Sequence, residues 1–316
     1  MANRLFVGGV LALWLGSMSW LLVDKVLPSF RDGEPPIAAG FETGVPVGWR
    51  VEWSGRAVGT AASIRLKGAM QTTELHNRVK LSEIPLLELA PGWLQQAVGD
   101  IGRLRLDAYT RLEFDSLDNF SSFETRVSVN DMPGVLRMSG RVNDSYLEMR
   151  IRSGELEYLP KVYLPDRGAM SEALFPDARL PFMYVGRQWK EEVYNPFRSP
   201  SAPVELVEAE VVGIENLETY DKRLVRTFRV EYRGRSGPGI PDAARLQSVA
   251  WVEAKEGQVL RQDVVVGASK LRFERLAAQA AEQACRDLFS GSAYPALQRV
   301  YGGAPPSPAA GMGSAD

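Results

Sequence analysis

The stretch RLRLDAYTRLEFD, residues 103–115, alternates apolar and polar side chains along its length. Successive side chains of a β-strand point to opposite faces of the sheet, so this period of two predicts a long strand with one dry face and one wet face. A strand of this length indicates a large, curved sheet. The predicted dry face consists of the even-numbered residues, Leu104, Leu106, Ala108, Thr110, Leu112 and Phe114.

The same alternation recurs on both sides of an irregular region at residues 164–187. Turn sequences such as NDMPG and VNDS separate the runs at the spacing of an antiparallel meander. Strands do not alternate with helices, which disfavours the parallel sheets of nucleotide-binding folds. The runs lie at residues 123–129, 136–140 and 146–152 in a first set, and at residues 204–214, 223–233, 246–254 and 258–266 in a second set. They form either two sheets or two halves of one barrel.

The composition is that of a globular protein that does not bind nucleic acid. Apolar residues make up 45% and charged residues 24% of the 316 residues, which is typical of a chain that folds around a core. The net charge of -2 gives no basic excess to neutralise phosphates, so nucleic acid is excluded as a partner. Cys285 is the single cysteine and permits no internal disulfide.

The N-terminal stretch LFVGGVLALWLGSMSWLLV, residues 5–23, carries no charged side chain. As a helix with a rise of about 1.5 Å per residue it would reach about 28 Å, close to the thickness of the hydrocarbon core of a bilayer. It therefore predicts a single transmembrane signal-anchor helix over residues 1–26, with the C-terminal domain outside the cytoplasm. A cleaved signal peptide is the alternative, but its apolar region is usually shorter and a small-residue cleavage site follows closely.

The rest of the chain divides by composition. Proline and glycine recur before the first strand and again at the C-terminus, as in a linker and a disordered tail. Alanines at helical spacing in LAAQAAEQACRDLF predict a short C-terminal helix that covers the sheet. The predicted parts are a linker at 27–47, an antiparallel β ectodomain at 48–290 with halves 48–163 and 187–276, its C-terminal helix at 276–289, and a tail at 302–316.

Residues that could carry chemistry are scarce. His76 is the only histidine, so histidine-rich metal sites and a conventional catalytic triad lack their parts. Cys285 has no histidine downstream to hold a proton, so it is expected to be a small apolar residue of the helix. We predict no catalytic residue, no metal site and no cofactor.

Pairs of carboxylates are the remaining route to acid and base catalysis. Glu191 and Glu192 are adjacent, and Glu208 and Glu210 share one face of a predicted strand. The second pair stands among apolar residues whose side chains point the other way, so a solvated strand face is the favoured interpretation.

Aromatic residues point instead to binding. Trp49 and Trp53 flank Val51 on one strand face, where they either pack in the core or line an apolar cavity. The stretch LPFMYVGRQWKEEVYNPF, residues 180–197, holds five aromatic residues between the two strand sets. It is expected to form the structural crossover. If the protein has a recognition surface, its predicted rim consists of Tyr184, Arg187, Trp189 and Tyr194.

Three segments, GWRVEWSGRAVGTAASIRL, LPFMYVGRQWKEEVYNPF and WVEAKEGQVLRQDV, resemble a bacterial envelope β-domain family of unknown function. In that family the domain often precedes a transglutaminase-like domain. The resemblance covers about residues 48–276 and its motifs are short. It implies an antiparallel, barrel-like fold, broadly similar to the curved sheets of lipoprotein-sorting carriers, and no established catalytic residues. The present chain ends where the enzyme domain of the longer relatives would begin.

These observations predict a mainly β, non-catalytic protein of the bacterial cell membrane. Its extracytoplasmic domain would bind a partner protein or an envelope component. The alternative is a carrier of lipid or another hydrophobic ligand with an apolar cavity in the β-domain. A carboxylate-based hydrolase is the third hypothesis.

Overall fold

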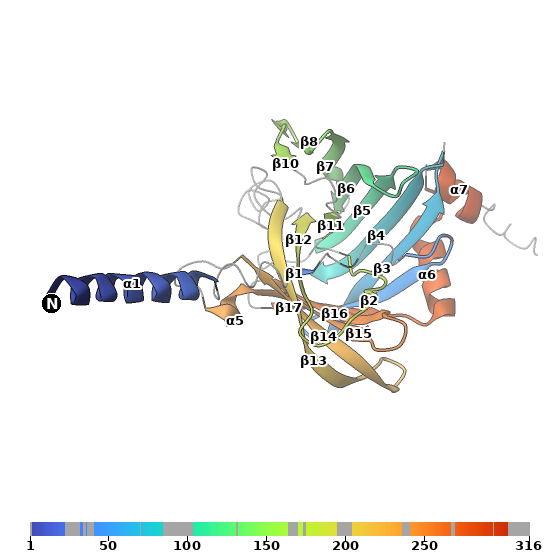
Figure 1. Cartoon of the computed structure of the whole chain (residues 1–316). Helices are drawn as coiled ribbons and strands as arrows, with labels where there is room; N and C mark the ends of the chain where they lie inside the picture. The colour runs from blue at the N-terminus through green and yellow to red at the C-terminus, as the bar shows by residue number, and fades with distance from the viewer. Residues whose placement is uncertain are drawn as a thin grey trace, which may run out of the picture.

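The computed structural model describes residues 2–22, 32–33, 36, 41–69, 71–84, 104–130, 132–163, 170–172, 175–194, 204–235, 241–266, 269–292 and 294–302. Within them, seventeen strands form one sheet (Figure 1). The strands are β1 (Asp32–Gly33), β2 (Val47–Trp53), β3 (Arg56–Lys67), β4 (Thr73–Ile84), β5 (Leu104–Phe114), β6 (Phe120–Val129), β7 (Met132–Asn143), β8 (Tyr146–Ser153), β9 (Leu156–Tyr158), β10 (Lys161–Tyr163), β11 (Met170–Glu172), β12 (Gln188–Tyr194), β13 (Val204–Glu218), β14 (Leu224–Gly234), β15 (Leu246–Glu253), β16 (Val259–Val266) and β17 (Ser269–Arg275).

The sheet is an antiparallel meander. Consecutive strands pair from β2 through β8, and again from β12 through β17. The pairing of β17 with β2 joins the two sets, so the choice between two sheets and one is resolved in favour of one. Short strands cover the ends: β9 and β10 pair with β8, and β1 and β11 run parallel to β12. Over the described residues the sheet is curved and does not close.

Strand β5 shows why the sequence folds this way. Leu104, Leu106, Ala108, Thr110 and Leu112 are all buried, and the residues between them are exposed or half-buried. The predicted alternation is confirmed for these five residues, and Phe114, the sixth of the predicted face, is half-buried against the core. Burying every second side chain removes apolar area from water while the polar residues stay hydrated.

The inner face of the sheet carries the main core. One contiguous cluster of buried apolar side chains extends over β2 to β8, β12 to β17 and the segment 175–180 that crosses the β15–β16 hairpin. Trp49, Trp189 and Phe273 are among its largest fully buried members. The segment is fastened to the hairpin by backbone hydrogen bonds, from Leu180 N to Gly257 O at 2.8 Å and from Val259 N to Ala178 O at 3.1 Å.

Helices cover part of the outer face. Helix α6 (Ala278–Phe289) confirms the predicted C-terminal helix and packs on β2, β3 and β4, followed by α7 (Pro295–Tyr301) (Figure 1). A one-turn helix, α5 (Asp242–Arg245), precedes β15. The helices and the outer face of β3 share a second apolar cluster, whose members are Ala62, Ile64, Leu66, Cys285, Leu288, Phe289, Ala296 and Leu297.

At the N-terminus, helix α1 (Ala2–Leu21) forms over most of the predicted anchor, and Figure 1 draws it apart from the sheet. Nevertheless, no helix in the described part of the chain is both long enough and apolar enough to cross a membrane, so the predicted transmembrane helix is not supported. Residues 23–26, much of the predicted linker and residues 303–316 of the predicted tail lie outside the described residues.

Candidate binding site

A corner of the sheet, residues 180–187, presents apolar side chains to solvent just before β12 begins. Phe182 is 87% exposed, Tyr184 62% and Val185 52%. Leu180, at the start of the corner, is buried in the main core. The corner therefore has one end fixed in the core and three exposed apolar side chains at its tip.

The backbone of the corner is held in one conformation. Phe182 has a left-handed φ of 59°, which is unfavourable for an aromatic residue and persists only where surrounding contacts impose it. The Arg187 guanidinium supplies two of those contacts by donating to Pro181 O at 2.9 Å and to Phe182 O at 3.0 Å. Further backbone bonds tie Gly186 N to Val211 O and Val211 N to Arg187 O, at 2.8 and 2.9 Å. The tip is consequently braced against β13.

Trp189 lies beneath the corner and is 1% exposed. The Arg187 guanidinium stands 5.6 Å from the centre of its ring, a cation–π contact, and the Tyr232 ring meets it edge-on at 6.0 Å. Its indole N–H donates to Glu191 Oε2 at 3.1 Å. Trp189 thus connects the exposed corner to a carboxyl group inside the sheet.

Two carboxyl groups interact in this interior. Removal from water, with the Asp177 charge adding to it, raises the pKa of Glu191 to about 8, and burial raises the pKa of Asp177 to about 6. The same burial raises the pKa of Tyr232 well above its ordinary value. Burial therefore favours the protonated form of this pair of carboxyl groups, most strongly at Glu191.

The predicted rim residues do not all lie at the surface. Tyr184 and Arg187 lie together at the corner, the first exposed and the second bracing it. Trp189 is in the core beneath them, and the side chain of Tyr194, at the end of β12, lies outside the described residues. Trp49 and Trp53 are both buried in the main core on β2. Any binding role for these residues stays a prediction.

The described members of the predicted carboxylate pairs each interact with another partner. Glu191 turns inward and interacts with Asp177, which the sequence did not single out, and the Glu192 side chain lies outside the described residues. Glu208 contacts Arg245 at 3.3 Å and Glu210 contacts Arg233 at 3.5 Å. Those two ion pairs agree with a solvated strand face.

Phe182 and Val185 are the binding candidates that the sequence reasoning missed. The sequence feature that could have identified them is the break in alternation at MYVG. A glycine there permits a backbone turn, and such a turn can direct the neighbouring apolar side chains outward. The glycine does take a left-handed conformation, with a φ of 85° at Gly186.

The single cysteine and the single histidine are both buried. Cys285 is fully buried on the side of α6 that faces β3, and removal from water raises the pKa of its thiol to about 12, which disfavours the nucleophilic thiolate. His76 is fully buried, with Nδ1 2.7 Å from the Tyr109 hydroxyl and Nε2 3.0 Å from Glu74 Oε2. Among the described residues, no group of three or more acidic, histidine or cysteine side chains is arranged so that it could hold a metal ion.

No family model and no curated protein matches the chain. Among solved structures, a beta-barrel-like protein of domain of unknown function DUF1849 from Brucella abortus is similar over 73% of this chain and 95% of that chain, with 10% identity and a TM-score of 0.44. A likeness at this level carries no argument about function.

Proposed function

We propose that the β-domain binds a partner protein without catalysing a reaction, and that the corner at 180–187 is its docking surface. The observation that carries the proposal is the presence of three exposed apolar side chains on a braced loop. Clustered exposed apolar groups are a feature of interaction sites, and a surface fixed before binding loses less conformational entropy on association. Phe182 and Tyr184 are of the aromatic type that anchors interfaces.

The other two hypotheses have less support. A hydrophobic carrier needs an apolar cavity, whereas the inner face of the sheet is occupied by a contiguous cluster of apolar side chains. A carboxylate-based hydrolase needs acids within reach of a substrate, whereas Glu191 is 8% exposed and accepts a hydrogen bond from the buried Trp189 indole.

Site-specific crosslinking tests the docking surface. A photoreactive phenylalanine analogue at position 182 should form an adduct with one identified envelope protein in cells. Leu117 is the matched control, because it is an apolar residue 80% exposed on a different turn. Adducts of equal yield and identity from both positions, or adducts with lipid alone at position 182, would overturn the proposal.

We propose in addition that the chain resides at the bacterial cell membrane with the β-domain outside the cytoplasm. The support is α1, whose apolar side chains are exposed, for example Phe6 at 71% and Leu13 at 78%. Such a surface favours attachment to lipid or to an apolar partner. Protease added to intact spheroplasts should cut the β-domain, and protection of the domain would contradict this location. A chain lacking residues 1–26 should leave the membrane fraction, and unchanged fractionation would contradict attachment through α1.

A further inference from the structure

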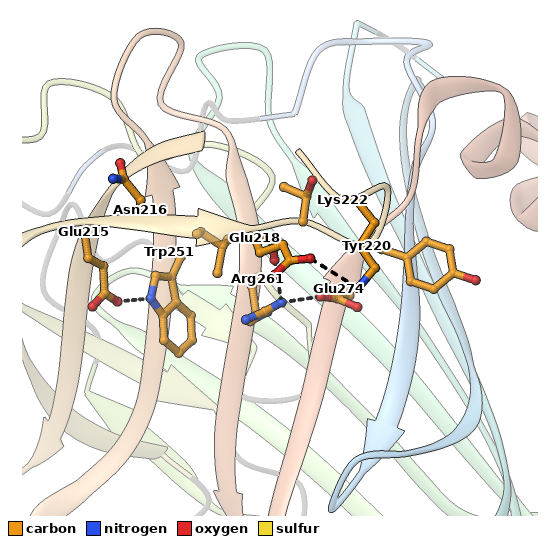
Figure 2. A pocket seen from close by; sticks show the side chains of 10 residues that line it. Glu215, Asn216, Glu218, Tyr220, Lys222, Trp251, Arg261 and Glu274 are labelled. Carbon is orange, nitrogen blue, oxygen red and sulfur yellow. Dashed lines mark hydrogen bonds and ion pairs between the residues drawn. The ribbon is translucent and has the colours of Figure 1, made fainter. Parts of the chain in front are cut away.

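A second site lies where the far end of β13 and the β13–β14 hairpin fold over the outer face of the sheet (Figure 2). The cavity there measures about 550 Å³, within the range of small-ligand pockets. Its walls come from the hairpin tip on one side and from β15, β16 and β17 on the other. They comprise Glu215, Asn216, Leu217, Glu218, Thr219, Tyr220, Lys222, Trp251, Arg261 and Glu274.

The hairpin tip is pinned over the sheet at two points. Arg261 Nη2 on β16 donates to Glu218 O at 3.0 Å. The Arg50 guanidinium on β2 lies 4.7 Å from the centre of the Tyr220 ring. A bulge in β13 between Val211 and Gly213 changes the pairing register just before the strand reaches the pocket. The cavity is therefore built by the fold rather than by a loose loop.

The charges around the cavity do not balance. Arg261 forms an ion pair with Glu274, and Lys222 pairs with Glu218 at 3.2 Å. This leaves Glu215, which is half-buried and accepts a hydrogen bond from the Trp251 indole N–H (Figure 2). No cation forms an ion pair with Glu215 among the residues that the structure describes. Three carboxylates thus line the cavity against two cations.

We infer that this pocket binds a positively charged group, an alkylammonium or a guanidinium, held by Glu215 beside the Trp251 ring. A cation would neutralise the remaining carboxylate. The Arg261 guanidinium already lies 5.8 Å from the centre of the Trp251 ring, so the attraction for the ligand comes from the charge of Glu215. An anion would meet three carboxylates, and an apolar ligand would have to displace water from polar walls without replacing its hydrogen bonds.

Titration of the full chain with n-butylammonium and ethylguanidinium tests this inference, with the indole N–H resonance of Trp251 as the reporter. Both cations should shift that resonance, whereas butyrate and 1-butanol should not. Equal binding of butyrate or 1-butanol, or no shift with either cation, would overturn the inference.

Two variants locate the charge. Glu215→Gln keeps an acceptor for the indole and removes the charge, so affinity for both cations should fall at least about tenfold, and Glu218→Gln should weaken binding less. Glu210→Gln, on the same strand but paired with Arg233, is the control and should bind as the wild type does. Unchanged affinity in a folded Glu215→Gln protein would contradict the assignment.

A third arm identifies the source of the cation. A blocked Gly-Lys-Gly tripeptide should bind more tightly than n-butylammonium if the natural ligand is a side chain of a protein, and no more tightly if it is a free amine. Either order supports a cation site. Because the pocket is separate from the corner, Phe182→Ser should leave cation binding unchanged.

Discussion

At the scale of single residues, Arg187 sets the shape of the corner. Its guanidinium donates to two successive carbonyl oxygens, at Pro181 and Phe182, and also stacks over Trp189. Replacing Arg187 with alanine should lower the free energy of unfolding by about 1.5–3 kcal/mol, the contribution of one hydrogen bond to a charged group, because the bond to Pro181 O is part-buried whereas the bond to Phe182 O is exposed. It should also reduce crosslinking from position 182. Arg141→Ala, at an exposed position of β7, is the control for losing an arginine and should change neither quantity.

Glu191 gives the interior a dependence on pH. Its pKa is raised from 4.5 to about 8, so the folded protein holds the proton more tightly than the unfolded chain does. Its contribution to stability is fully present below about pH 4.5 and is lost as the pH rises toward 8. Each unit of a raised pKa corresponds to about 1.4 kcal/mol. Because Asp177 titrates with it, the profile belongs to the pair.

Glu191→Gln is the variant that tests this dependence, because it keeps an acceptor for the Trp189 indole and removes the titrating proton. Relative to the wild type it should become progressively more stable between about pH 5 and pH 8, as measured by urea unfolding at each pH. Glu208→Gln, on the outer side of β13, should show no such trend. A parallel pH profile for the wild type and Glu191→Gln would show that the interior carboxyl does not titrate in this window.

At the scale of elements, Gly59 permits the close approach of β3 and β4. A Cβ at this position would lie 2.0 Å from Lys80 O, a backbone atom that cannot move without breaking the ladder. Gly59→Ala should therefore destabilise the protein by about 1–3 kcal/mol, the typical cost of overpacking. Gly213→Ala is the matched control, since nothing lies within 4 Å of its Cβ and it also occupies a strand. Thermal unfolding of both variants compares them, and equal losses would mean that the clash is relieved by a small strand shift.

Elements with a strong local period were predictable, and contacts between distant elements were not. The alternation in β5 and the alanine stripe of α6 each follow from local side-chain spacing. The approach of Asp177 to Glu191 depends on where the segment 175–180 crosses the sheet, which no local pattern encodes. Phe182 was missed because periodicity assumes that apolar residues turn inward, and a left-handed backbone at that position reverses the direction.

At the scale of the whole molecule, the pairing of β17 with β2 makes two separately predicted strand sets into one folding unit. The last strand of one set pairs with the first strand of the other: on β17 and β2, the facing residues are Leu271 and Trp53, Arg272 and Glu52, and Phe273 and Val51. The inner core runs across this seam without interruption. Neither set can bury its inner face alone, which predicts that both unfold together.

Native-state hydrogen exchange measures this coupling. The slowest amides of β5 and β6 and those of β14 and β15 should report the same free energy of opening, because each needs global unfolding to exchange. Cys285 supplies an independent probe without any substitution, since it is the only cysteine and is buried between α6 and the sheet. Its labelling by a thiol reagent in rising urea should share the midpoint of the loss of β-structure seen by circular dichroism. Exchange at two distinct free energies would mean that the β17–β2 pairing opens first. Labelling of Cys285 before the loss of β-structure would mean that α6 detaches while the sheet persists. Either result would divide the chain into smaller cooperative units.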